Sequence, residues 1–370
     1  MEKPIRILHV LGRLDRGGAE TMVMNLYRNI DRTQIQFDFI IHTTDKCDYN
    51  DEIEELGGKI YTIPRYTGKN HFYYKKAWHN FFQRHTEYEL IHGHVRSTAS
   101  IYVKIAKKYS LKTIVHSHSI SSGTGVKSKI KDLMQLPIRS IADYLFACSD
   151  EAGKWLFGKN VVDKENYKVI KNAIDVEKYV INEEVRKKML KDLQIEGKFV
   201  LGHVGRFSYE KNHEFLIEVF YELQKQCENA VLLLVGDGEL KPKIEEQIYQ
   251  LGIQEKVILT GSVSNVHEYM QAMDVFVFPS HYEGLGMVAI EAQASGLPCV
   301  ISDRIPKQVI VTEVVTSLPL SNASHWVGVI LDKNTPTQRE GVSFGVIKQG
   351  YDIRDQVENL KNIYFDILSN

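Results

Sequence analysis

The stretch HYEGLGMVAIEAQASGLPCVIS, residues 281–302, decides the fold that the sequence predicts. Residues 275–280 (VFVFPS), which directly precede this stretch, form an apolar run with β-branched and aromatic side chains. The run closes at a proline, and this pattern is typical of a buried strand. Residues 287–295 then have helical spacing, and Gly296 is expected to end that helix. The sequence therefore predicts a strand, a glycine-containing tight turn and a helix.

Two glutamates flank the turn. Glu283 follows the strand, and Glu291 lies about two turns into the helix. Free amides at a helix N-terminus bind anions, and a carboxylate close to them suits the hydroxyl groups of a ribose. We therefore interpret 281–302 as a nucleotide-diphosphate pocket. A surface turn with two solvated glutamates is the alternative that these residues alone leave open.

The composition is that of an ordinary globular protein. The chain has 370 residues, 43% hydrophobic and 25% charged, with a formal net charge of −1. This length suits two domains of about 150–200 residues each. The sequence has no apolar run near the roughly 18 residues of a membrane span and no signal peptide at its start, so a cytoplasmic protein is expected. Its four scattered cysteines are expected to be core thiols, and nothing indicates a nucleic-acid partner.

Strand-like and helix-like segments alternate along the chain. Strands are predicted at 5–12, 37–43, 59–64, 90–95, 113–119 and 144–149, and again at 198–207, 230–238, 257–261, 275–280 and 299–302. Such alternation predicts α/β domains with parallel, doubly wound sheets. We therefore predict two Rossmann-like domains that face a central cleft. They are residues 1–175, on which a C-terminal helix at 351–370 packs back, and residues 198–350, with a linker helix in 176–197.

Ligands of doubly wound sheets bind beyond the carboxyl ends of the strands, so the loops there are expected to carry the chemistry. Gly17 and Gly18 could let the backbone approach a phosphate or a sugar. Arg206 and Lys211 could neutralise a diphosphate. Gly236 lies in a loop that could leave room for a nucleoside. Tight turns and surface charges are the structural alternatives.

His116 and His118 lie at the end of the predicted strand 113–119. Because side chains alternate along a strand, both are expected to point to the same side of it. Metal ligation by this pair is conceivable, because imidazole is a common ligand of transition metals. A hydrogen-bonded pair in the core is the structural alternative.

Basic side chains dominate residues 96–139, where Asp132 is the only acid. Within this range, residues 127–146 combine lysines with apolar residues at helical spacing. Such a segment could lie on an anionic lipid surface. A helix packed in the core with one solvated face has the same pattern, so the sequence leaves both interpretations open.

Five motifs occur together and in order. They are GGAE (17–20), VIKNAID (169–175), GRFSYEKN (205–212), VGDGEL (235–240) and EGLGMVAIE (283–291). With them the chain resembles the retaining glycosyltransferases of family four, most closely the branch that builds bacterial exopolysaccharide and capsule. The resemblance runs over nearly the whole chain. It implies the GT-B fold, a nucleotide-sugar donor and transfer with retention of anomeric configuration.

The resemblance also implies roles for single residues. Glu291 would bind the ribose hydroxyls, and Glu283 would hold the donor sugar or steady charge at its anomeric carbon. His118 matches the family's active-site histidine, which contacts the donor sugar. Gly17 and Gly18 match the loop that lines the cleft from the first domain.

The diphosphate would be held by Arg206 and Lys211 and by the amides of Leu285, Gly286 and Met287 at the helix start. Because the sequence has no Asp-x-Asp motif and these groups already supply positive charge, we expect neither a metal ion nor another cofactor.

The resemblance thus predicts a hexosyltransferase that moves a sugar from a UDP-sugar to a lipid-linked or oligosaccharide acceptor, peripherally at the inner face of the cell membrane. Two other classes of function stay open. A nucleotide-sugar epimerase of the same fold would use carboxylates as general acid and base. A non-catalytic scaffold of a polysaccharide assembly complex would keep only the pocket.

Overall fold

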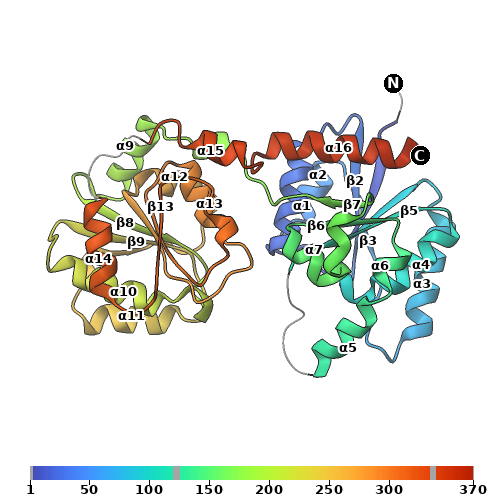
Figure 1. Ribbon diagram of the computed structural model, residues 1–370, viewed down its shortest axis with the longest axis horizontal. Helices are drawn as coiled ribbons and strands as arrows, with labels where there is room; N and C mark the ends of the chain where they lie inside the picture. The colour runs from blue at the N-terminus through green and yellow to red at the C-terminus, as the bar shows by residue number, and fades with distance from the viewer. Residues whose placement is uncertain (1–2, 120–125, 334–338, 370) are drawn as a thin grey trace. The chain divides into compact units, whose positions relative to one another are not determined.

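The computed structural model describes residues 3–119, 126–333 and 339–369, with the side chains of 126–130 left out. The chain forms two compact units (Figure 1). The first comprises residues 1–173 and 353–370, and the second comprises residues 174–352. Each unit is an α/β domain built on one parallel sheet, so the predicted fold class is confirmed.

The first unit has a seven-stranded sheet in the order β3-β2-β1-β4-β5-β6-β7. Its strands are β1 (Ile5–Val10), β2 (Ile35–Ile41), β3 (Ile60–Thr62), β4 (Leu90–Gly93), β5 (Lys112–Ser117), β6 (Tyr144–Ala147) and β7 (Tyr167–Val169). Its helices are α1 (Gly18–Asn29), α2 (Asn50–Glu55), α3 (His71–Arg84), α4 (Arg96–Lys108), α5 (Val126–Gln135), α6 (Ile138–Ile141), α7 (Asp150–Phe157) and α16 (Ile353–Ser369), with a 3₁₀ turn η1 (Lys159–Asp163).

Helices cover both faces of this sheet, which explains the continuous apolar strands. All seven residues of β2 are buried. Residues of α1, α2 and α16 pack on one face, and residues of α3, α4, α6 and α7 pack on the other. The C-terminal helix α16, red in Figure 1, lies against α1 and buries Leu360 and Tyr364 in the core of this unit.

The second unit has a six-stranded sheet in the order β10-β9-β8-β11-β12-β13. Its strands are β8 (Phe199–Val204), β9 (Ala230–Val235), β10 (Val257–Leu259), β11 (Val275–Phe278), β12 (Cys299–Ser302) and β13 (Val315–Leu318). Its helices are α8 (Val176–Tyr179), α9 (Glu183–Asp192), α10 (His213–Gln224), α11 (Lys241–Gln250), α12 (Val266–Ala272), α13 (Met287–Ala294), α14 (Ala323–Asp332) and α15 (Ser343–Lys348), with 3₁₀ turns η2 (Tyr209–Lys211), η3 (Gln254–Lys256) and η4 (Lys307–Val309).

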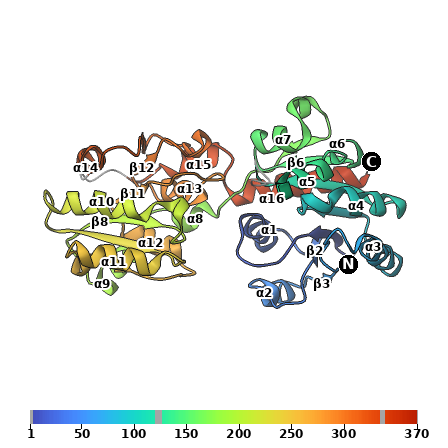
Figure 2. The same ribbon diagram turned by 90° about the horizontal axis from the view of Figure 1, so that it is seen from below.

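This sheet is covered in the same way. Residues of α10, α11 and α14 pack on one face, and residues of α8, α9, α12, α13 and α15 pack on the other. Figure 2 shows helices above and below the strands of each unit. In both units the strand order is that of a Rossmann domain, with the order reversing beside the first strand.

The segment 176–197, predicted as a linker helix, belongs to the second unit. Its helix α9 packs on α12, and Met189 is buried there. Arg186 donates to the carbonyl oxygens of Gln271 and Met273 and pairs with Asp274 at 2.6 Å. The charged residues of this helix therefore attach it to the sheet, which its sequence pattern did not reveal.

The segment 127–146, whose helical spacing left a lipid-surface helix and a core-packed helix open, does not form one continuous helix. The segment divides into α5, the short α6 and strand β6. Ile138 in α6 is fully buried, whereas Leu133 and Leu136 near the end of α5 are 67% and 47% exposed. The apolar residues keep helical spacing across Pro137, where α5 has ended and α6 begins. The sequence pattern therefore did not show where packing into the core begins.

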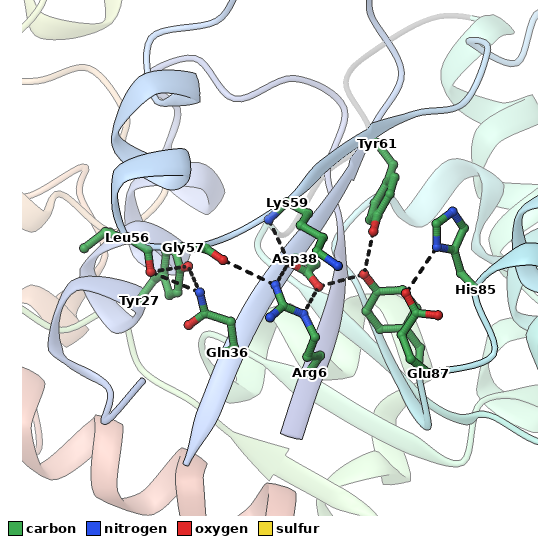
Figure 3. A network of polar contacts seen from close by, with 11 residues as sticks. Arg6, Tyr27, Gln36, Asp38, Leu56, Gly57, Lys59, Tyr61, His85 and Glu87 are labelled. Atoms are coloured by element: carbon green, nitrogen blue, oxygen red, sulfur yellow. Dashed lines mark hydrogen bonds and ion pairs between the residues drawn. The ribbon is translucent and has the colours of Figure 1, made fainter. Parts of the chain in front are cut away.

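A buried carboxylate organises one end of the first sheet (Figure 3). Asp38 in β2 is fully buried and accepts hydrogen bonds from Arg6 Nε and Nη2 at 2.5 and 2.6 Å. It also accepts from the Lys59 amide and the Tyr88 hydroxyl, each at 2.7 Å. These four bonds link β1, β2 and the residues that precede β3 and β4, and they offset the desolvation of the charge.

Replacement of Asp38 by alanine is expected to destabilise the first unit by about 3 kcal/mol or more, because the arginine, the amide and the hydroxyl all lose their acceptor. Urea unfolding followed by circular dichroism measures the loss. Asp51→Ala serves as the control, since Asp51 pairs with Lys46 on the surface, where both side chains are about 70% exposed. Equal stability of the two variants would contradict this account of Asp38.

Candidate functional site

In the second unit, the sequence-predicted residues gather where the strand order reverses. This point lies between β8 and β11, and ligands of such sheets bind beyond the carboxyl ends of these strands. The loop 205–212 follows β8, and the loop 279–286 follows β11. Every residue proposed to hold the diphosphate comes from one of these loops or from the start of α13.

Direct contacts join the two loops. Asn212 takes a left-handed backbone conformation with φ of 55°, and its Nδ2 donates to the Pro279 carbonyl oxygen at 3.1 Å. The His281 amide donates to the Glu210 carbonyl oxygen at 2.8 Å, and the Tyr282 hydroxyl donates to the Glu210 carboxylate at 2.8 Å. These bonds fix the two loops to each other.

Lys211 and Glu283 form an ion pair between these loops, with 2.6 Å between Nζ and Oε1. Their side chains are only 18% and 11% exposed. The Ser280 hydroxyl donates to the same carboxylate oxygen at 2.7 Å, and the Lys211 ammonium lies 4.8 Å from the centre of the Phe278 ring. Low exposure strengthens these interactions, so the pair is held in a defined position.

Arg206 is placed differently. Its side chain is 73% exposed and pairs with Glu239 at 3.2 Å. An exposed pair of this kind contributes little to stability. The guanidinium can therefore leave Glu239 for a ligand phosphate at small cost in stability.

Helix α13 starts at the same place. Gly286, its N-terminal cap, has φ of 88°, and no side chain caps the helix there. Uncapped amides at a helix start are available to an anion. The predicted donors Leu285, Gly286 and Met287 thus lie at this start, beside Glu283.

Glu291 lies in the second turn of α13 and is hydrogen-bonded to Tyr179 of α8. Burial raises its pKa to about 7, against the opposing effects of the Tyr179 hydrogen bond and of the positive charge of Lys211. The carboxyl group therefore changes its charge near neutral pH, which suits a group that meets a ligand.

Gly236 and Gly238 serve backbone packing. A side chain at Gly236 would clash with the Gly205 carbonyl oxygen, and one at Gly238 would clash with the Phe207 backbone. Gly236 also has φ of 143°, which favours glycine. Both glycines let the loop after β9 lie against the loop after β8, and the role of Gly236 toward a nucleoside stays a prediction.

In the first unit, Gly17 and Gly18 precede and begin α1. Gly17 lines a cavity of about 700 Å³ at the carboxyl ends of β1, β2, β3 and β4. Charged groups of both signs line it, among them Glu20, Arg65 and Lys131. Burial raises the pKa of Glu20. The cavity thus offers donors and acceptors for a polar ligand.

His118 belongs to a larger group of histidines in the first unit. His118 Nε2 lies 2.7 Å from His94 Nδ1, and His94 Nε2 lies 3.0 Å from His9 Nδ1. His116 Nδ1 lies 3.2 Å from His92 Nε2. Burial lowers the pKa of His9 and of His118 to about 3 and those of the other three far below their usual range, so the rings are neutral.

Sequence reasoning missed several of these residues. His9, His92 and His94 lie in predicted strands, and the alternation at 92 and 94 repeats that at 116 and 118, which was the signal. Tyr179 had no such signal, because only the packing of α8 on α13 brings it to Glu291.

Comparison with known proteins agrees with the fold. The family models "Glycosyltransferase Family 4" and "Glycosyl transferases group 1" match residues 16–178 and 185–322. The putative glycosyltransferase EpsF of Bacillus subtilis (strain 168) is 35% identical, over 97% of this chain and 96% of its own length. The UDP-Gal:alpha-D-GlcNAc-diphosphoundecaprenol alpha-1,3-galactosyltransferase of Escherichia coli is 24% identical, over 77% of each chain.

Among solved structures, that of Anabaena Alr3699/HepE in complex with UDP and glucose has the same fold. It superposes with a TM-score of 0.76 at 19% identity, over 98% of this chain and 100% of that one. The fold is therefore the two-domain GT-B fold. The chain belongs to the family-four glycosyltransferases, in the branch that makes bacterial polysaccharides.

Within the described residues, we find no helix that is long and apolar enough to span a membrane.

The raised pKa of Glu291 predicts a dependence of stability on pH. Because the folded state keeps this carboxyl protonated up to about pH 7 and its ordinary pKa is 4.5, the free energy of unfolding falls as pH rises between these values. Glu291→Gln removes this titration. The variant should gain stability relative to the wild type, by up to about 3 kcal/mol, between pH 4.5 and 7. Urea unfolding at several pH values measures the difference, and a constant difference would contradict the raised pKa.

Proposed function

We propose that this glycosyltransferase moves a hexose from a UDP-sugar to a lipid-linked or oligosaccharide acceptor, with retention of configuration and without a metal ion. The observation that carries the proposal is the gathering of Lys211, Glu283 and the start of α13 at the point where the second sheet reverses its strand order. Arg206 and Glu291 lie on the same loops and helix.

Each group has a role that its chemistry supports. The ionised Glu291 would accept hydrogen bonds from the ribose hydroxyls, with Tyr179 holding its carboxylate. Lys211, Arg206 and the amides of 285–287 would hold the diphosphate. With two cationic side chains and a helix start at hand, the phosphates need no divalent cation to balance their charge.

Lys211 would keep its ion pair with Glu283 when the donor binds. The lysine ammonium has three protons and can keep one hydrogen bond to Glu283 while it donates to a phosphate oxygen. Glu283 would then lie beside the donor sugar. There it would accept from the sugar hydroxyls or stabilise positive charge at the anomeric carbon.

The reaction places charge where these groups can stabilise it. The bond between the anomeric carbon and the phosphate oxygen breaks, and UDP leaves with the electron pair. The acceptor hydroxyl forms the new bond on the same face of the sugar, and its proton passes to a phosphate oxygen of the departing UDP. Fixed positive groups at the diphosphate favour this separation of charge. His118, held by His94, would contact the sugar as a neutral donor or acceptor.

The first unit would hold the acceptor. Its cavity of about 700 Å³ offers polar groups for sugar hydroxyls or phosphates. The E. coli relative acts, by its name, on a diphosphoundecaprenol-linked sugar. A lipid-linked acceptor would bring this enzyme to the membrane surface. Leu133 in α5 and Leu136 just after it are exposed, and the basic residues Lys131 and Arg139 are close to them in sequence, which suits an anionic bilayer.

A thermal-shift panel of nucleotide sugars, with and without EDTA, tests the donor site. We expect one UDP-sugar to stabilise the protein equally in both conditions. Glu291→Ala should weaken donor binding by about 10–100-fold, because a charged hydrogen-bond acceptor is lost. Arg206→Ala and Lys211→Ala should lower kcat by about 100-fold or more, with smaller effects on donor affinity.

Lys225→Ala is the control for these variants, because Lys225 also pairs with a glutamate but lies at the C-terminal cap of α10. Unchanged kinetics in all three site variants would contradict the assignment. Conversion of the UDP-sugar without any acceptor would favour an epimerase instead. NMR of the new linkage tests retention, and an inverted anomer would rule it out.

Vesicle flotation tests the membrane surface. The double variant Leu133→Ser, Leu136→Ser should bind anionic phospholipid vesicles at least tenfold more weakly. Each leucine that becomes buried in the bilayer contributes about 1.5–3 kcal/mol to binding. Tyr249→Ser, which removes a 73% exposed aromatic ring from the second unit, serves as the control. Equal flotation of both variants would contradict contact through α5.

A further inference from the structure

Of the histidine group in the first unit, only His118 has a role in the proposed donor site. The members of the group come from neighbouring parallel strands. His9 of β1 lies directly beside His92 of β4 in the sheet register. The register between β4 and β5 pairs His92 with Ile114, so continuing it past Gly93 places His94 beside His116. Imidazole rings from three strands thus stack on one side of the sheet at its carboxyl edge.

The hydrogen bonds among these rings leave nitrogen atoms unused. His116 Nε2 and His118 Nδ1 are both buried and have no hydrogen-bond partner within the described part of the chain. His116 as a residue is 1% exposed. Because an unpartnered buried nitrogen is costly, a water molecule or an ion is expected to satisfy these atoms.

We propose that His94, His116 and His118 form a binding site for a transition-metal ion such as Zn²⁺. One ring nitrogen from each lies within 4.8 Å of the others. Three histidines with a fourth position open to water or another ligand are an established way to bind zinc. The metal would replace the hydrogen bonds that now hold these rings together, among them the 2.7 Å contact between His94 and His118.

The chemistry of the three ligands selects the metal. All three are imidazoles, which suit Zn²⁺, Cu²⁺ and Ni²⁺ and not the oxygen-seeking Mg²⁺ or Ca²⁺. His9, His92 and His94 also come close enough to hold an ion, but all three are buried. His118 is partly exposed, so an ion can reach the trio that contains it.

Outer contacts orient the proposed ligands. His92 Nε2 lies 3.2 Å from His116 Nδ1, and His92 Nδ1 lies 2.7 Å from the Tyr364 hydroxyl of α16. These two hydrogen bonds fix the orientation of the His116 ring and leave its Nε2 for the metal. A hydrogen bond to the far nitrogen is the usual second contact of a metal-bound histidine.

The proposed site has a consequence that rests on the proposed function. Since His118 is also the residue proposed to contact the donor sugar, a bound metal would remove it from the reaction. Zn²⁺ would therefore inhibit transfer. Transfer itself would need no metal.

Competition with a chromogenic zinc indicator tests the site directly. Full-length protein, freed of metal by a chelator, is expected to bind one equivalent of Zn²⁺. His118→Asn and His116→Ala each remove a proposed metal ligand. Each should weaken Zn²⁺ binding by more than about 10–100-fold, which is the loss expected when only a hydrogen-bond partner of a ligand is removed. Co²⁺ provides a second readout, because a three-histidine site gives the intense visible absorption of a tetrahedral ion.

His213→Gln is the matched control, because His213 is a buried histidine of the second unit whose ring nitrogens also lack partners in the described structure. Its affinity for Zn²⁺ should equal that of the wild type. Should His116→Ala fail to fold, His118→Asn decides the matter, since His118 lies past the end of β5.

Absence of stoichiometric Zn²⁺ binding, or binding that is unchanged in His118→Asn, would overturn the proposal. The transferase assay is scored separately. Stoichiometric binding with an unchanged transfer rate would support the metal site and contradict only the role proposed for His118. Loss of transfer in metal-free protein would contradict metal-independent function and leave the binding result to decide the site.

Discussion

The ion pair between Lys211 and Glu283 is the interaction on which the proposed donor site depends. It joins the loops after β8 and β11, where the strand order of the second sheet reverses. Because both side chains are mostly buried, neither can be removed without leaving the other charge uncompensated. In the proposed donor site, the pair would keep a cation for the phosphates and a carboxylate for the sugar in one place. Such preorganisation is the main source of electrostatic catalysis.

The two units use buried polar groups in different ways. The Asp38 carboxylate of the first unit accepts hydrogen bonds from Arg6, Lys59 and Tyr88. These groups stabilise its charge, so Asp38 contributes to the stability of the fold. Glu291 of the second unit has one tyrosine partner and a pKa raised to about 7. The histidines lie between these cases, with most nitrogens paired and a few left over. Glu291 and the histidines are therefore the buried polar groups at which we propose that ligands bind.

Most of the fold could be predicted from the sequence, because strands covered on both faces are continuous apolar runs. The edge strands β7 and β13 were not predicted, since Lys168 and Ser317 are exposed and break such runs. Charged and glycine residues at strand ends indicated Lys211, Glu283 and Glu291. Tyr179 could not be predicted, since only tertiary packing places it beside Glu291. The packing role of Gly236 likewise depends on a contact between two loops.

A crystal structure of the protein with bound UDP would test the central claim most directly. The account predicts the ribose hydroxyls within hydrogen-bond distance of the Glu291 carboxylate. It also predicts the diphosphate against Lys211 and the first amides of α13. UDP bound with its diphosphate out of reach of both groups would contradict the account.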